Sequence, residues 1–160
     1  VLKVAVDGDV LLFSRNANVG SLADYDSAGQ IDRSGSWNFF YSGSLPQVSY
    51  VQSGQNGASF LDGTTLTLYS EDPGVTLTLA FSGGVVTSTF QSPDEGPFVD
   101  RDQSYFYERV GETGMWIRVA GDTLYFDENL KNGSLADYDQ YGRIDSSGSW
   151  NFTYSGTIEF

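Results

Sequence analysis

Residues 20–43 and residues 133–156 carry nearly the same sequence: GSLADYDSAGQIDRSGSWNFFYSG in the first case and GSLADYDQYGRIDSSGSWNFTYSG in the second. Gly20 corresponds to Gly133 and Trp37 to Trp150, so one ungapped offset of 113 residues relates the two copies. Only five of the 24 paired positions differ. An internal repeat decides how the fold is predicted, because each copy is a unit whose apolar face has to be buried against something else.

The similarity extends upstream of this stretch with the same offset. Residues 8–13 read GDVLLF and residues 121–126 read GDTLYF. The chain therefore holds one copy in residues 1–44 and a second in residues 114–157, with an unrepeated segment between them. Two arrangements are compatible with this pattern: a slice of a tandem array of such units, or one domain that contains a duplicated multi-strand segment.

In the array arrangement, residues 1–44 are strands without their usual partners. An exposed strand edge is a template for pairing, so these strands are expected to complete a sheet in the same chain or in a neighbouring chain. Head-to-tail contacts that do not close into a ring build filaments. The repeat therefore predicts self-association, and it divides the chain into a partial repeat copy (residues 1–52), a linker (residues 53–57) and a main unit (residues 58–160).

The residue inventory excludes several classes of function. The 160 residues carry a net charge of −13, so the clustered cations that bind nucleic acids or anionic membrane surfaces are missing. There is no cysteine and no histidine, which removes disulfides, thiolate–zinc sites and the usual general base of enzymes. No apolar run approaches the ~20 residues of a membrane-spanning helix. We therefore expect a non-enzymatic protein that neither binds nucleic acid nor inserts into a membrane.

The distribution of apolar residues predicts an all-β protein. Aromatic residues make up 15% of the chain, and threonine alternates with apolar residues in stretches such as residues 64–70 and 75–81. Side chains at alternate positions of a strand share one face, so these stretches indicate half-buried strands. Hairpin-length turns between them predict an antiparallel meander that includes the duplicated multi-strand segment and is closed as a barrel or as a two-sheet sandwich.

The repeated loops carry the pattern Asp-x-Asp-x-x-Gly-x-Ile-Asp, whose carboxylates are candidate ligands for calcium. Ca²⁺ takes six to eight oxygen ligands, and the spacing matches five positions of an EF-hand loop. The twelfth position is Gly35 or Gly148 instead of the bidentate glutamate. A bound ion would therefore be held weakly, with a dissociation constant of about 0.1–1 mM. The alternative is a turn in which the aspartates accept hydrogen bonds from backbone N–H groups. The candidate ligands are Asp24, Asp26, Asp32, Asp137, Asp139 and Asp145.

Three aromatic residues alternate along each copy of the repeated strand, so they share one face. One interpretation is a core face, because large aromatic side chains suit half-buried strands. A second interpretation is a platform on which sugars stack, and a third is a surface for strand pairing between units. The residues are Trp37, Phe39 and Tyr41 in the first copy and Trp150, Phe152 and Tyr154 in the second.

Residues 60–156 resemble the calycin group of β-barrels, which includes the lipocalins. Three stretches carry the resemblance: LDGTTL at Leu61–Leu66, YFYERV at Tyr105–Val110 and GSW at Gly148–Trp150, which is similar to the Gly-x-Trp motif of lipocalins. The resemblance implies an up-and-down barrel of about eight strands, sometimes with a cavity for an apolar ligand. In that family the motif lies on the first strand, whereas here it lies near the end of the sequence. The chain also resembles tandem bacterial surface-repeat domains.

These observations favour an extracellular or cell-surface protein with a structural role. The leading hypothesis is a subunit of a filament, sheath or adhesin array that associates head to tail by strand pairing, with Ca²⁺ as a stabilising ion. The alternative is a lipocalin-like module that binds a small ligand, or a module that binds a glycan or a host surface. No cofactor other than Ca²⁺ is expected.

Overall fold

Fourteen strands and one short 3-10 turn make up the regular structure of the described residues, which confirms the prediction of an all-β protein. The computed structural model describes residues 2–14, 16–45, 55–56 and 59–160. Of the predicted linker at residues 53–57, Gln55 and Asn56 form strand β5, and the other positions lie outside the described residues.

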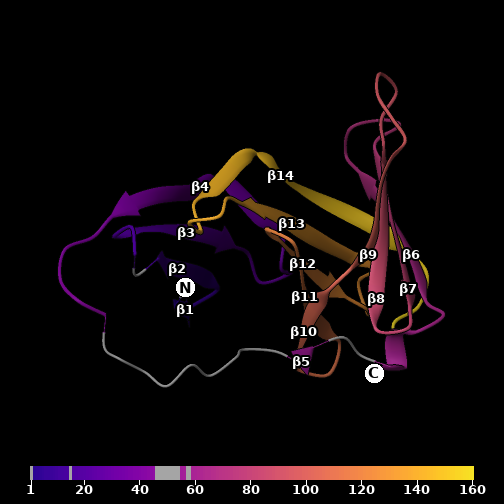
Figure 1. Cartoon of the computed structure of the whole chain (residues 1–160), viewed down its shortest axis with the longest axis horizontal. Coiled ribbons are helices and arrows are strands. Elements are labelled where there is room, and N and C mark those ends of the chain that lie inside the picture. The colour runs from indigo at the N-terminus through magenta and orange to yellow at the C-terminus, as the bar shows by residue number, and fades with distance from the viewer. Residues whose placement is uncertain (1, 15, 46–54, 57–58) are drawn as a thin grey trace.

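The strands form two antiparallel sheets (Figure 1). The first has the order β1-β2-β3-β4, and the second has the order β5-β10-β11-β12-β13-β14-β6-β7-β8-β9. The strands of the first sheet are β1 (Leu2–Val6), β2 (Asp9–Ser14), β3 (Val19–Tyr25) and β4 (Ile31–Phe40). Those of the second are β5 (Gln55–Asn56), β6 (Thr65–Ser70), β7 (Thr76–Ser82), β8 (Val85–Gln91), β9 (Phe98–Gln103), β10 (Tyr105–Val110), β11 (Gly114–Val119), β12 (Asp122–Asp127), β13 (Asn132–Tyr138) and β14 (Ile144–Ser155), with the 3-10 turn η1 (Ser59–Leu61) preceding β6.

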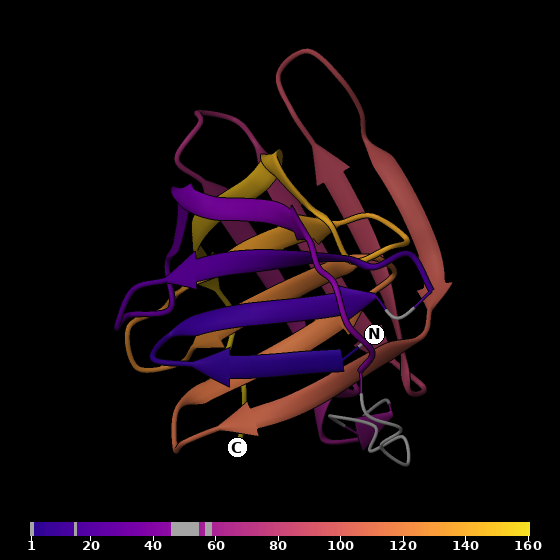
Figure 2. The same ribbon diagram turned by 90° about the vertical axis from the view of Figure 1, so that its left-hand side faces the viewer.

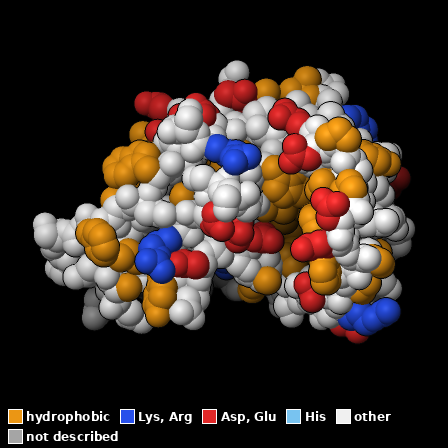
Figure 3. All heavy atoms as spheres, turned by 90° about the horizontal axis from the view of Figure 1, so that it is seen from above, with side chains coloured by type: hydrophobic (Ala, Val, Ile, Leu, Met, Phe, Trp, Pro, Cys, Tyr) orange, Lys and Arg blue, Asp and Glu red, His pale blue; other side chains and the backbone are white. Residues whose placement is uncertain are grey.

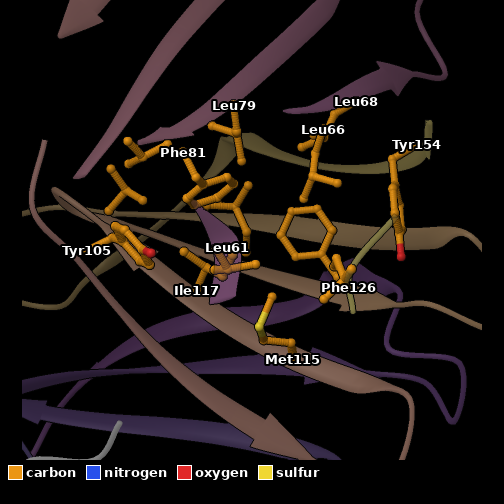
Figure 4. Close-up of a cluster of buried hydrophobic side chains, with 14 of the residues drawn as sticks. Leu61, Leu66, Leu68, Leu79, Phe81, Tyr105, Met115, Ile117, Phe126 and Tyr154 are labelled. Atoms are coloured by element: carbon orange, nitrogen blue, oxygen red, sulfur yellow. The ribbon is translucent and has the colours of Figure 1, made fainter. Parts of the chain in front are cut away.

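Nine strands of the second sheet, from β10 round to β9, curl into a nearly closed barrel. The turn Gly83-Gly84 between β7 and β8 has φ angles of +62° and +78°, which glycine adopts without strain and which suit a two-residue hairpin. The barrel encloses the main core, and Figure 4 shows side chains converging there from η1 and from β6, β7, β10, β11, β12 and β14.

The duplicated sequence folds twice into the same four-stranded unit, as β1–β4 and as β11–β14. Both units contain the same bulge, at Leu22/Asp24 in the first and at Leu135/Asp137 in the second. The backbone N–H of Asp24 donates to Ser36 Oγ at 3.1 Å, and the N–H of Asp137 donates to the equivalent Oγ at 3.0 Å. Each bulge is therefore fixed by a serine that the repeat preserves.

The first sheet lies face to face on the β11–β14 part of the second, as Figure 2 shows. Between them is a second core of seven buried residues, in which each of three positions is filled from both copies. Ala23 and Ala136 at the two bulges are fully buried, and their small side chains allow the sheets to approach closely. The equivalent pairs are Ala23/Ala136, Tyr25/Tyr138 and Ile31/Ile144.

The hydrogen bonds across this interface are reciprocal. The Asn38 side chain donates to Ile144 O at 2.9 Å and accepts from Ile144 N at 2.7 Å. Asn151, the equivalent of Asn38, donates to Ile31 O at 3.0 Å and accepts from Ile31 N at 2.7 Å.

Two serines repeat the reciprocity. Ser21 Oγ donates to Gly142 O at 2.6 Å, and Ser134 Oγ donates to Gly29 O at 2.7 Å. A residue of the first copy thus contacts a given position in the second copy, and its equivalent in the second copy contacts the same position in the first. This is the pattern of an interface around a two-fold axis, here between two copies of a segment within one chain.

We expect Asn38→Ala and Asn151→Ala to destabilise the protein by similar amounts. Each substitution removes two partly buried hydrogen bonds to an isoleucine backbone, each of which contributes about 0.5–1.5 kcal/mol. Urea unfolding measures the free energies, with Asn16→Ala in an exposed turn as the control. Costs below about 0.5 kcal/mol for either asparagine would contradict the reciprocal interface.

Candidate functional site

The acidic loops are folded by hydrogen bonds from their own backbone. Asp26 Oδ1 accepts from Ala28 N at 2.8 Å and from Gln30 N at 2.9 Å. Asp139 Oδ1 accepts from Tyr141 N and Arg143 N at the same two distances. The second aspartate of each motif therefore holds an Asx turn.

The third aspartate of each motif has a similar local role. Asp32 Oδ1 accepts from the N–H and the hydroxyl of Ser34, and Asp145 Oδ1 accepts from the same groups of Ser147. The serine hydroxyl is the largest cause that holds the pKa of Asp32 and of Asp145 below the ordinary value, followed by the backbone N–H. Their carboxylates are stabilised as anions without a metal ion.

The first aspartate of each motif lies elsewhere, beside an aspartate from the preceding hairpin. Asp24 is next to Asp9, and Asp137 is next to Asp122. Among the described residues, no group of three or more acidic side chains is placed to hold a metal ion. The six predicted ligands are thus divided between turns and carboxyl pairs, and calcium binding stays a prediction.

We expect Asp139→Ala to destabilise the protein by about 1 kcal/mol, because two backbone N–H groups lose their acceptor. Asp139→Asn keeps an acceptor oxygen at this position and should therefore destabilise the protein less. Thermal unfolding in EDTA and in millimolar Ca²⁺ tests both variants. An effect seen only with Ca²⁺ would show that the loop is an ion site instead of a self-supported turn.

The two carboxyl pairs are equivalent in the repeat but differ in their surroundings. Asp122 and Asp137 line a cavity of about 270 Å³ in the barrel, together with Asp100 and Trp150. Burial, followed by the neighbouring Asp137 carboxylate, raises the pKa of Asp122 to about 7. Burial followed by the charge of Asp9 also raises the pKa of Asp24, although this pair lies outside the barrel.

Asp122 makes the stability of the protein depend on pH. Its pKa is about 7 in the folded state against 3.8 ordinarily, so the folded state binds this proton more strongly than the unfolded chain. The stabilisation is complete below about pH 4 and is lost as the pH rises to about 7. We expect Asp122→Asn to be more stable than the wild type at pH 8 and similar to it at pH 4.

Urea unfolding between pH 4 and pH 8 measures this difference. Asp9→Asn, the equivalent substitution outside the barrel, is the matched control and should change the pH profile less. A profile that Asp122→Asn leaves unchanged would contradict the assignment of the raised pKa to Asp122.

The repeated aromatic strand has different surroundings in its two copies. Phe152 and Tyr154 are buried in the main core, and Trp150 packs against it, as the core interpretation predicts. Trp37, the equivalent of Trp150, is 53% exposed. Phe39 and Tyr41 are half-buried.

The side chains themselves are arranged alike in both copies. The ring centroids of Phe13 and Phe39 are 5.4 Å apart, and those of the equivalent Phe126 and Phe152 are 5.3 Å apart. Tyr41 also contacts Phe13 edge-on, as Tyr154 contacts Phe126. The difference between the copies therefore lies in what covers the rings.

Other apolar side chains on the same face of the first sheet are exposed or half-buried. Val4 and Val6 are 37% and 53% exposed, whereas the equivalent Ile117 and Val119 are in the main core. In the described part of the chain, β4 is an edge strand, and no strand continues the sheet beyond it. Figure 3 shows exposed hydrophobic side chains at the end of the molecule that holds this sheet. We call this surface the open face; it consists of Val4, Val6, Leu11, Phe13, Leu22, Trp37, Phe39 and Tyr41.

A cleft of about 720 Å³ lies between β1–β2 and β10–β12. Lys3 Nζ lies 4.9 Å from the Trp116 ring centroid and 3.7 Å from Glu108 Oε2, and Tyr25 meets the Trp116 ring edge-on. The hydroxyls of Tyr25 and Tyr138 are neighbours, but the buried Tyr25 oxygen lacks a hydrogen bond of normal geometry. If the protein binds a small ligand, this cleft is the candidate site. Ligand binding stays a prediction.

Sequence reasoning missed three of these features. Lys3 and Trp116 come from different sheets, so no local pattern brings them together. Asp9 and Asp122 are preserved in the upstream part of the repeat, and that signal was available. Alternation along the strand places Asn38 on the face opposite the aromatic residues, but it does not indicate a partner for Asn38 across the interface.

None of the described segments forms a helix long and apolar enough to cross a membrane. Comparison of the chain with models of protein families, with curated proteins and with solved structures finds no match. The resemblance to calycin barrels and to surface-repeat domains therefore stays a resemblance.

Proposed function

We propose that the protein is a non-enzymatic structural module of the extracellular space or the cell surface, which assembles into a larger array through the open face. The observation that supports this proposal is the pair of equivalent apolar surfaces, one enclosed in the barrel and one exposed. A surface that keeps core side chains without a core is typical of an interface.

The open face contains enough apolar surface to drive association. Full burial of one large apolar side chain contributes roughly 1.5–3 kcal/mol. Trp37, Val6 and Val4 are all more than one-third exposed, and the half-buried side chains around them add to the area. The sum is several kcal/mol, which is the scale needed to offset the lost freedom of two associating proteins.

The net charge of the chain affects the same equilibrium. Two copies with a charge of −13 each repel one another at low ionic strength. At 0.1 M salt the Debye length is about 10 Å, so repulsion between charges farther apart than this is largely screened. Salt does not weaken the burial of apolar side chains. Association through the open face is therefore expected to strengthen with salt, unlike association through ion pairs.

We expect the purified chain to self-associate, and Val6→Ser combined with Trp37→Ser to weaken that association at least about tenfold, because two exposed apolar side chains are lost from the interface. Sedimentation velocity over a range of concentrations at 0.05 M and 0.5 M salt measures it.

Phe98→Ser is the matched control, because Phe98 is 56% exposed but lies on β9 of the barrel. A wild-type chain that stays monomeric at all concentrations, or an association that the control weakens as much as the double substitution does, would refute the proposed function.

A further inference from the structure

In the second copy of the repeat, the surface equivalent to the open face is covered by other parts of the chain. The residues equivalent to Val4, Phe13 and Phe39 are in the main core. They share that core with side chains from the unrepeated segment of the chain, and none of the described residues takes the equivalent place over the first copy. These side chains are Leu61, Leu66, Leu68, Leu79, Phe81, Val86 and Tyr105.

Both edges of the first sheet correspond to paired strands in the second. β4 is an edge, whereas its equivalent β14 pairs with β6. β1 is the other edge, whereas its equivalent β11 pairs with β10. The segment that runs from β6 to β10 thus pairs with both edges of β11–β14 and forms the rest of the nearly closed barrel over their apolar face.

The lengths of the two equivalent strands differ where this pairing occurs. β14 continues to Ser155, and residues 152–155 are the ones that pair with β6. β4 ends at Phe40, two positions before the equivalent of Ser155. The backbone at residues 39–42 of the first copy is therefore the place where a further strand would be added.

We propose that the occupant of the open face is a segment with the chemistry of this repeat's own residues 60–113, supplied by a neighbouring unit, and that its first strand pairs antiparallel with residues 39–42. This inference rests on the proposed assembly function and names its partner. The register follows from the second copy, in which Phe152 lies opposite Ser70 and Tyr154 opposite Leu68. In the first copy, Phe39 and Tyr41 take those places.

Phe40 supports this assignment. It is 86% exposed, and it replaces Thr153 at one of the few positions where the two copies differ. Thr153 lies opposite Tyr69 in the β14–β6 pair. An incoming strand in the same register places a tyrosine opposite Phe40, and aromatic cross-strand pairs stabilise antiparallel sheets.

The test is an extended chain in which residues 60–113 are repeated directly ahead of Val1, because residue 113 precedes the equivalent of Val1 in the second copy. Phe40→Cys in the chain and Tyr69→Cys in the added segment place the only two thiols opposite each other, since the protein has no cysteine of its own. Directly opposed residues of an antiparallel pair have the Cα separation that a disulfide needs.

We expect a disulfide to form under mild oxidation in this chain and not in a control with Thr65→Cys in place of Tyr69→Cys. Hydrogen exchange at residues 39–42 should slow at least about tenfold in the extended chain without cysteines. An added segment with Leu66→Ser, Leu68→Ser and Leu79→Ser should give neither result. Equal cross-linking at both cysteine positions, or unchanged exchange at residues 39–42, would overturn the inference.

The two proposals fail in different ways. If the chain associates through the open face but the added segment leaves that association unchanged, the face has another occupant and only the inference is wrong. If the chain does not associate, yet the added segment protects residues 39–42, the geometry is right and the assembly function is wrong.

Discussion

Two asparagine side chains, Asn38 and Asn151, hold the two copies of the repeat in one fixed relation. Each bonds both backbone groups of an isoleucine in the opposite copy, so a side chain takes the place that a neighbouring strand would otherwise occupy. The first copy forms a sheet of its own that packs against the second copy and does not add strands to the barrel. Because a buried backbone group without a partner is costly, this arrangement is specific in register as well as in orientation.

The open face follows from that constraint. Because one face of the first sheet packs against the second copy, the opposite face, which carries the aromatic side chains, points away from it. The second copy has the same two sides, but its aromatic side is enclosed by β6 and the strands that follow. Two nearly identical sequences therefore end in different surroundings, and the contrast identifies a surface that the described residues leave uncovered.

The sequence was sufficient for the fold class, because alternation and hairpin turns are local signals. The repeat also indicated that residues 1–44 and 114–157 would share a structure. It could not show that the copies pack against one another around a two-fold axis, since alternation assigns Asn38 to a face without saying what lies opposite. Glu108 and Lys3 meet for a similar reason, through tertiary packing that no spacing encodes.

The acidic motif shows a different limit of sequence reasoning. The same aspartates fit a weak calcium loop and a self-supported turn, because both need oxygens directed into a tight bend. The structure assigns Asp26 and Asp139 to backbone N–H groups and places Asp24 and Asp137 beside other carboxyls. Spacing alone does not distinguish a metal from a backbone amide as the partner of an oxygen.

The symmetry of the joint between the copies also limits how such units can be connected. A contact in which both sides use the same patch is saturated once two members have met, so it has no direction and cannot lengthen a chain. Any polymer of this repeat needs a second, different contact beside that symmetric joint, and the one proposed above, between the open face and residues 60–113 of a neighbour, is asymmetric. Its polarity, and thus the difference between its growing end and its finished end, would come entirely from the asymmetric contact.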